Sequence, residues 1–134
     1  MAYSLLIVDD SNIVRKVLMK AVNMSGLEIS AVHEAEHGQQ ALEVLNKHWV
    51  DLVFLDINMP VMNGMEFMEK LRAHESLSKT PVVIVSTEGS KDRRDHLEQL
   101  GIDAYLRKPV TAEQIAEVVK SALQHPGQSG GGRS

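Results

Sequence analysis

The chain has no cysteine, which excludes disulfide bonds and thiol chemistry and fits a reducing compartment. It also lacks a cluster of basic residues, and its net charge of -4 argues against direct binding to nucleic acid. Its apolar runs are short, so the sequence predicts neither a transmembrane span nor a signal peptide. We therefore expect a soluble cytoplasmic protein that makes no contact with a membrane.

Nucleotide-binding loops of the G-x-G-x-x-G or Walker type are absent from the sequence as well. The 134 residues suffice for one domain that buries about two-thirds of the surface exposed by its unfolded chain. We expect this domain to span residues 1–124. Residues 125–134 are rich in Pro, Gly and Ser and predict a flexible tail, either a linker or a cloning scar.

Short apolar runs alternate with segments of helical periodicity along the chain. Strands are predicted at about 3–8, 27–32, 52–55, 82–85 and 102–106, and helices at about 13–22, 38–46, 65–72, 90–100 and 111–123. The second strand alternates polar and apolar residues, as an edge strand would. The predicted fold class is α/β: a doubly wound, flavodoxin-like (βα)5 domain whose parallel sheet, in strand order 2-1-3-4-5, carries helices on both faces.

Polar side chains stand where the predicted strands end. Asp9 and Asp10 follow the first strand, Asp56 the third, Ser86 the fourth and Lys108 the fifth. The carboxyl ends of parallel strands share one edge of a sheet, and in this order the first and third strands are neighbours. The three carboxylates should therefore converge, with the hydroxyl and the ammonium group beside them.

Asp56 occupies the centre of this arrangement. The apolar run 52–55 leads into it, and the turn-forming segment 58–64 follows. A plainer interpretation is that Asp56 only starts a turn and that Asp9 and Asp10 only cap a helix. The agreement between the strand ends favours a ligand site instead.

Clustered carboxylates raise one another's pKa unless a cation neutralises them. Mg²⁺ suits such a cluster, because it takes carboxylate, water and phosphate oxygens as ligands. Lys108 would supply a compact positive charge for a phosphoryl oxygen, and Ser86 a hydroxyl donor. A carboxylate nucleophile, a metal, an ammonium group and a hydroxyl are what phosphoryl transfer to a protein requires.

Four motifs occur in order along the chain: Val8-Asp9-Asp10-Ser11, Leu55-Asp56-Ile57-Asn58-Met59-Pro60 followed by Asn63-Gly64, Val85-Ser86, and Arg107-Lys108-Pro109. Together they resemble the receiver domain of two-component response regulators. The resemblance covers residues 3–124, and because no output domain is evident after them, the chain is most similar to stand-alone, CheY-like receivers. Such a protein is a signalling switch that assists its own phosphorylation and dephosphorylation rather than an enzyme.

The resemblance implies a role for each matching residue. Asp56 would accept the phosphoryl group from a sensor histidine kinase or a histidine phosphotransfer protein. Mg²⁺, for which Mn²⁺ can substitute, would be held by Asp10, Asp56 and the backbone carbonyl of Asn58, with Asp9 acting through a metal-bound water. Lys108 would contact the phosphoryl group, and its bond to Pro109 is expected to be cis.

The resemblance also implies a switch and a readout. Ser86 would turn toward the phosphoryl group and Tyr105 would swing inward behind it. A downstream target protein would then bind the surface of the fourth helix, fifth strand and fifth helix, and the chain itself would be a monomer or a weak dimer. The basic residues of the fourth helix predict a solvated face or part of a partner surface.

Three residues near the site tune the expected lifetime of the phosphorylated state. Asn58 and Glu88 are the pair found in chemotaxis receivers that dephosphorylate quickly, which predicts short-lived phosphorylation. Thr87 stands where the family usually has Ala or Gly, so it would narrow the mouth of the site and act in the opposite direction.

Three other classes of protein share single features of this sequence. His33-Glu34-Ala35-Glu36-His37 matches the H-E-x-x-H pattern of zinc proteases, but the adjoining strand and Gly38 favour a strand end and loop rather than the required helix. A haloacid-dehalogenase-type phosphatase needs an acid two residues after its nucleophile, where this chain has Asn58. A phosphorylation-independent interaction domain would keep the fold without using the acidic residues.

Overall fold

The computed structural model describes residues 2–87 and 90–124, and within them strands and helices alternate as the sequence predicts. The strands are β1 (Tyr3–Val8), β2 (Ile29–Ala35), β3 (Leu52–Leu55), β4 (Val82–Ser86) and β5 (Ala104–Arg107). The helices are α1 (Asn12–Met24), α2 (Gly38–Lys47), α3 (Gly64–Ala73), α4 (Lys91–Gln99) and α5 (Ala112–Val119), the last continued by the π-helical turn η1 (Lys120–Gln124).

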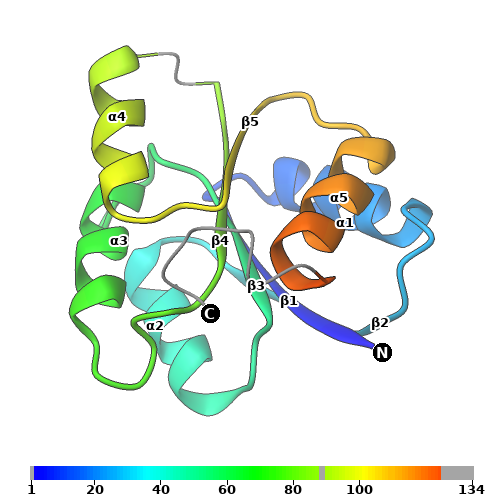
Figure 1. Cartoon of the computed structure of the whole chain (residues 1–134), viewed down its shortest axis with the longest axis horizontal. Helices are drawn as coiled ribbons and strands as arrows, with labels where there is room; N and C mark the ends of the chain where they lie inside the picture. The colour runs from blue at the N-terminus through cyan, green and yellow to red at the C-terminus, as the bar shows by residue number, and fades with distance from the viewer. Residues whose placement is uncertain (1, 88–89, 125–134) are drawn as a thin grey trace.

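All neighbouring strands are parallel, and they lie in the order β2-β1-β3-β4-β5. Figure 1 shows α1 and α5 on one side of the sheet and α2, α3 and α4 on the other. The predicted doubly wound fold is therefore confirmed. In the described part of the chain, no helix is both long and apolar enough to span a membrane.

The short central strand β3 supplies both layers of the core. Its side chains alternate, so that Leu52 and Phe54 pack in the cluster under α1 and α5, and Val53 and Leu55 in the cluster under the other three helices. All four are almost wholly buried, which is why the sequence of this strand is continuously apolar. This packing fixes the direction in which residue 56 leaves the sheet.

Two strands lie further along the chain than predicted. β2 covers Ile29–Ala35 rather than 27–32, because its pairing with β1 continues as far as Val8 and Ala35. β5 covers Ala104–Arg107 rather than 102–106. In both cases tertiary pairing, which no local pattern encodes, determines the ends of the strand.

The H-E-x-x-H segment is not a helix. His33 to Ala35 belong to β2, and His37 is the N-cap of α2, where its Nδ1 accepts a hydrogen bond from the backbone N–H of Gln40. The interpretation of this segment as strand end and loop is confirmed, and the zinc-protease geometry is excluded.

Side chains cap the starts of α3 and α5, which follow the carboxyl ends of β3 and β5. A capping box of Thr111 and Gln114 is present at the start of α5. A second box joins Asn63 and Glu66 at the start of α3. Each box satisfies backbone donors at a helix start close to the predicted site.

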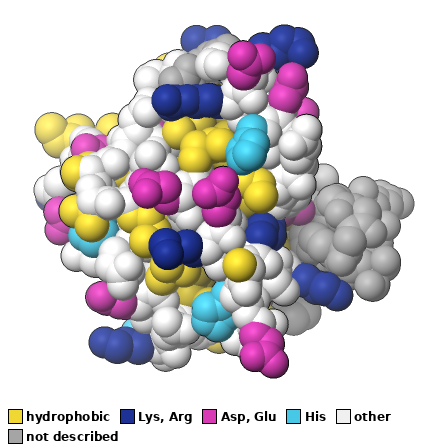
Figure 2. All heavy atoms as spheres, turned by 90° about the vertical axis from the view of Figure 1, so that its left-hand side faces the viewer, with side chains coloured by type: hydrophobic (Ala, Val, Ile, Leu, Met, Phe, Trp, Pro, Cys, Tyr) yellow, Lys and Arg dark blue, Asp and Glu magenta, His cyan; other side chains and the backbone are white. Residues whose placement is uncertain are grey.

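Helix α4 packs through few apolar contacts. Of its residues, all within the described part of the chain, Leu97 alone is buried. Figure 2 shows the side of the molecule formed by α3 and α4 as a mixture of basic, acidic and histidine side chains with hydrophobic surface between them. One of the contacts here is the pair of His96 and Glu69, whose nitrogen and oxygen are 3.5 Å apart.

Arg72 ties the end of α3 to the end of α4. Its guanidinium donates hydrogen bonds to the backbone carbonyls of Leu100 at 2.6 Å, Gly101 at 2.9 Å, Thr80 at 2.8 Å and Ser78 at 3.1 Å. One side chain thereby satisfies four backbone carbonyls, two after α4 and two in the segment between α3 and β4.

Candidate functional site

The two acidic strand ends leave the sheet side by side. The backbone N–H of Asp56 donates to the carbonyl of Val8 at 2.9 Å, and the N–H of Asp9 donates to the carbonyl of Ala35 at 3.0 Å. The ladder therefore continues one residue past β1 and β3, and it holds the backbone of both aspartates in place.

Asp9, Asp10 and Asp56 converge as the sequence predicts. One carboxylate oxygen of each lies within 4.8 Å of one from each of the others. Asp9 and Asp56 are buried, whereas Asp10 is exposed at the mouth of the group. Three hard oxygen donors at this spacing, open to solvent on one side, fit the ligand preferences of Mg²⁺.

Lys108 is the cation of the group. Its Nζ lies 2.6 Å from Oδ2 of Asp9 and 3.6 Å from Oδ1 of Asp56. Its backbone N–H donates to the carbonyl of Ser86 at 3.1 Å, and its bond to Pro109 is cis, as the resemblance implies. The ammonium group thus bridges the loops that follow β1 and β3 from a third loop, beyond β5.

Asp56 is harder to ionise than an ordinary aspartate. Burial raises its pKa, and the neighbouring carboxylate of Asp9 raises it further. The ammonium group of Lys108, the backbone N–H of Ile57 and the hydroxyl of Ser86 act in the opposite direction, because each stabilises the charged form. A bound divalent cation would add to this second group of effects.

The other predicted residues surround this group. Ser86 is fully buried and its side chain hydrogen-bonds to Asp56, while Thr87 is exposed. Tyr105 is partly buried, and the guanidinium of Arg94 lies 5.1 Å from the centre of its ring. Glu88, the remaining predicted residue, lies outside the described residues.

The loop from β3 to α3 is bent tightly beside Asp56. A Cβ on Gly64 would lie 2.5 Å from the carbonyl oxygen of Asp56, so no other residue fits there without displacing the backbone. Val61 has a φ of 67°, which is strained for a β-branched residue, and the N–H of Met62 donates to the carbonyl of Pro60 across it at 2.7 Å. Strained backbone of this kind often accompanies a functional site.

Sequence reasoning missed two arginines near the site. Arg93 of α4 donates from Nη1 to the side-chain oxygen of Asn58 at 3.2 Å, so one residue expected on a solvated helix face contacts the loop that follows Asp56. Arg15 of α1 is buried and contacts the backbone of Asp9. Both contacts cross between elements, and the sequence pattern carries no signal for either.

Comparisons with known proteins agree with the receiver-domain resemblance of the four motifs. The family model for the response regulator receiver domain matches residues 5–120. The chemotaxis protein CheY homolog of Campylobacter jejuni is 35% identical over 120 residues, which cover 89% of this chain and 91% of the relative. The polar-differentiation response regulator DivK of Brucella ovis is 30% identical, with 92% and 98% covered.

Among solved structures, the chemotaxis protein CheY4 of Vibrio cholerae matches with a TM-score of 0.80 at 29% identity, covering 92% of this chain and all of that one. The chain belongs to the response regulator receiver family. It is a CheY-like signalling domain of two-component systems, a family that uses Mg²⁺, and its acidic group could bind such an ion.

Proposed function

We propose that the chain accepts a phosphoryl group on Asp56 from a sensor histidine kinase or a histidine phosphotransfer protein. The observation that carries this proposal is the convergence of Asp9, Asp10 and Asp56 within 4.8 Å, bridged by the ammonium group of Lys108. This arrangement supports the proposal, because phosphoryl transfer to a carboxylate requires a nucleophile, a divalent cation and a fixed positive charge around one point.

In the proposed step, a carboxylate oxygen of Asp56 attacks the phosphorus of a phosphohistidine. A P–O bond forms, the P–N bond breaks, and its electron pair remains on the imidazole of the donor, which then takes up a proton. The product on this chain is an acyl phosphate. Asp10, Asp56 and the backbone carbonyl of Asn58 would hold Mg²⁺, with Asp9 acting through a water, and the metal would neutralise charge on the transferring oxygens.

Lys108 and Ser86 would receive the new phosphoryl oxygens. The ammonium group of Lys108 already lies near Oδ1 of Asp56, and Ser86 already hydrogen-bonds to the acceptor. Phosphorylation adds about 1.5 to 2 negative charges and strong acceptor oxygens at this point. Both side chains would therefore turn from the carboxylates toward the phosphoryl group.

The apolar surface beside Lys108 supports a protein as the donor. A groove of about 320 Å³ runs between α1 and the loop after β5, and it is almost entirely apolar. Val17 of α1 is exposed and lines the groove. Ile13, which is also exposed on α1, adds apolar surface outside the groove lining. A helix of the donor that covered the groove would bury apolar area while its phosphohistidine reached Asp56. The groove is lined by Val14, Val17, Leu18, Thr87, Lys108, Pro109 and Val110.

The proposed output runs through Ser86 and Tyr105 to the surface of α4, β5 and α5, where a downstream target would bind. Movement of Ser86 toward the phosphoryl group would make room for the ring of Tyr105, on which Arg94 now lies. Asn58 and Glu88 would favour rapid self-dephosphorylation, and Thr87 would oppose it. The similarity to chemotaxis proteins supports a chemotaxis-type role.

The test is intact mass after incubation with acetyl phosphate and Mg²⁺, run beside Asp56→Ala. We expect a gain of one phosphoryl group, about 80 Da, that requires Mg²⁺ and is absent from the variant. If no adduct forms, binding of beryllofluoride, an acyl-phosphate mimic, separates a short-lived phosphate from an inert site. Failure of both would leave a phosphorylation-independent interaction domain as the better interpretation.

A further inference from the structure

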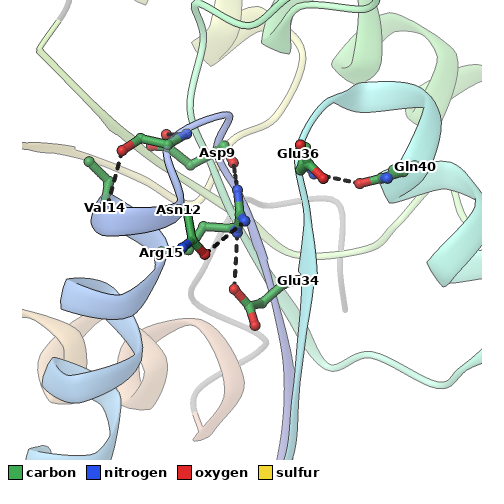
Figure 3. A network of polar contacts seen from close by, with 8 residues as sticks. Asp9, Asn12, Val14, Arg15, Glu34, Glu36 and Gln40 are labelled. Carbon is green, nitrogen blue, oxygen red and sulfur yellow. Dashed lines mark hydrogen bonds and ion pairs between the residues drawn. The ribbon is translucent and has the colours of Figure 1, made fainter.

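Arg15 lies in the second turn of α1 and points toward the turn between β1 and α1 (Figure 3). Its Nη1 donates to the backbone carbonyl of Asp9 at 2.6 Å, its Nε to Oε1 of Glu34 at 3.0 Å, and its Nη2 to Oδ1 of Asn12 at 3.2 Å. Only 10% of its side chain is exposed. A planar guanidinium with three different acceptors has one orientation, so the carbonyl of Asp9 is held against a rigid donor.

The carbonyl of Asp9 belongs to the same planar peptide unit as the N–H of Asp10. Whatever holds this carbonyl therefore sets the direction from which Asp10 projects its carboxylate. The other groups of Asp9 are also engaged: its N–H donates to Ala35, and its side chain accepts from the N–H of Ser11 at 2.9 Å. The contact from Arg15 completes the restraint on this turn.

We propose that Arg15 is a positioning residue for the divalent-cation site, acting through the peptide between Asp9 and Asp10 and anchored by Glu34 of the edge strand β2. This inference rests on the proposed function, because it assumes that the acidic group holds a cation. Residues that orient metal ligands typically contribute about 10- to 100-fold to metal affinity. Arg15 contacts neither the metal nor the phosphoryl group in this account.

A purely electrostatic role would have the opposite consequence. The guanidinium is a positive charge close to an acidic cation site, so its removal would strengthen cation binding if charge alone mattered. Its own charge is largely balanced by Glu34 at 3.0 Å. Positioning predicts that removal weakens binding, and the sign of the change in affinity therefore distinguishes the two roles.

The experiment is calorimetric titration of the full chain with Mg²⁺. We expect Arg15→Met to weaken Mg²⁺ binding about tenfold. Glu34→Gln should weaken it about threefold, because Arg15 keeps its bond to Asp9 but loses its charged anchor. Glu34 is 40% exposed beside a cleft of about 460 Å³ between α1 and α2, so water can partly replace this anchor.

Arg72→Met is the matched control. Arg72 also donates to several backbone carbonyls, but at the ends of α3 and α4 rather than beside the carboxylates. The Arg72→Met variant should have a lower melting temperature than the parent chain, and its Mg²⁺ affinity should stay within about twofold of the parent value. If general loss of stability weakened Mg²⁺ binding, the Mg²⁺ affinity of both variants would fall alike. Loss of positioning lowers the affinity of Arg15→Met only.

Unchanged or tighter Mg²⁺ binding in folded Arg15→Met would overturn the inference. If that variant does not fold, Glu34→Gln carries the test, and unchanged affinity there would overturn it equally. A parent chain that binds no Mg²⁺ would overturn the proposed cation site together with this inference. A parent chain that binds Mg²⁺ but shows no difference between variants would overturn only the role of Arg15.

Discussion

Asp56 combines two requirements that oppose each other. It must be ionised to act as a nucleophile, yet burial and the carboxylate of Asp9 raise its pKa. Lys108 and Ser86 reduce this cost without removing it. The residue that the proposed reaction depends on is therefore also one that destabilises the fold at neutral pH.

Asp56→Asn should stabilise the chain at pH 7 without Mg²⁺. We expect a gain of about 1 kcal/mol or more in the free energy of unfolding, or roughly 3–6 °C in melting temperature. Because the pKa of Asp56 is raised on folding, its cost is complete above the folded value and vanishes below the ordinary value of 3.8. The gain should therefore shrink as the pH falls, in thermal melts from pH 7 to pH 4.

Glu117→Gln is the control, since Glu117 is an exposed carboxylate of α5. It should change stability by less than about 0.5 kcal/mol at any of these pH values. A gain in Asp56→Asn as large at pH 4 as at pH 7 would show that ionisation of the carboxylate is not its cause.

His33 provides a pH dependence of the opposite sign. Its ring stacks on that of His48 with centroids 4.5 Å apart, and burial, followed by the charge of His48, lowers its pKa below 6.5. The unfolded chain thus binds a proton first as the pH falls, and stability is lost below about pH 6.5. In chemical denaturation between pH 7.5 and 5.5, His33→Gln should lose less stability than the parent chain.

His48→Gln should remove only part of this acid sensitivity, because the neighbouring ring is the smaller of the two causes. Identical pH profiles for the parent chain and His33→Gln would contradict this account.

The sequence predicts the position of some site residues but not of others. Asp9, Asp10, Asp56, Ser86 and Lys108 stand at strand ends, and their convergence follows from the parallel sheet. Arg15 and Arg93 reach across to other elements with long side chains, and such contacts depend on helix rotation that no local pattern specifies. The strain at Val61 was missed for a similar reason, since its positive φ results from closing a loop around Gly64.

Among the elements, α4 is held by polar contacts more than by apolar packing. Its buried contribution is Leu97, while Arg93 contacts Asn58 beside the acceptor and Arg94 lies over Tyr105. Arg93 and Arg94 thus connect α4 to the loop after Asp56 and to Tyr105, the two regions that the proposed switch would couple. The sequence predicts the extent of this helix well but predicts nothing about these ties.

Arg93→Ala should loosen the first turns of α4. Loss of a hydrogen bond worth about 1 kcal/mol would raise local opening about fivefold, measured as faster amide exchange over residues 91–99. Lys91→Ala is the matched control on the same helix, because the ion pair of Lys91 to Asp95 stays within α4. Equal acceleration in both variants would attribute the effect to helix propensity or charge instead of the tie to Asn58.

At the scale of the whole molecule, strand order and fold class could be predicted because the strands and helices alternate regularly. The ends of β2 and β5 could not, since they depend on pairing with the preceding strand across an intervening helix. The same topology gathers residues from the carboxyl ends of β1, β3, β4 and β5 into one site. Occupation of that site should therefore stabilise the entire domain.

Mg²⁺ should raise the melting temperature of the parent chain. At a concentration 100-fold above the dissociation constant, binding to the folded state alone adds about 2.7 kcal/mol. Asp10→Asn, which removes the exposed ligand, should show a smaller rise in differential scanning calorimetry, while its melt in EDTA should stay close to that of the parent chain. An equal rise in both would place the cation elsewhere.

The contact between Lys108 and Asp9 joins residues 99 positions apart in the chain, from strands that are not neighbours in the sheet. While the ribosome is still making the polypeptide, the acidic residues are present without their ammonium partner. In the folded sheet β3 and β4 lie between β1 and β5, so Lys108 reaches Asp9 only when all four of these strands are assembled. In the proposed function, an incompletely folded molecule would therefore be a poor phosphoryl acceptor, and the donor would transfer the group only to copies whose last strand has docked.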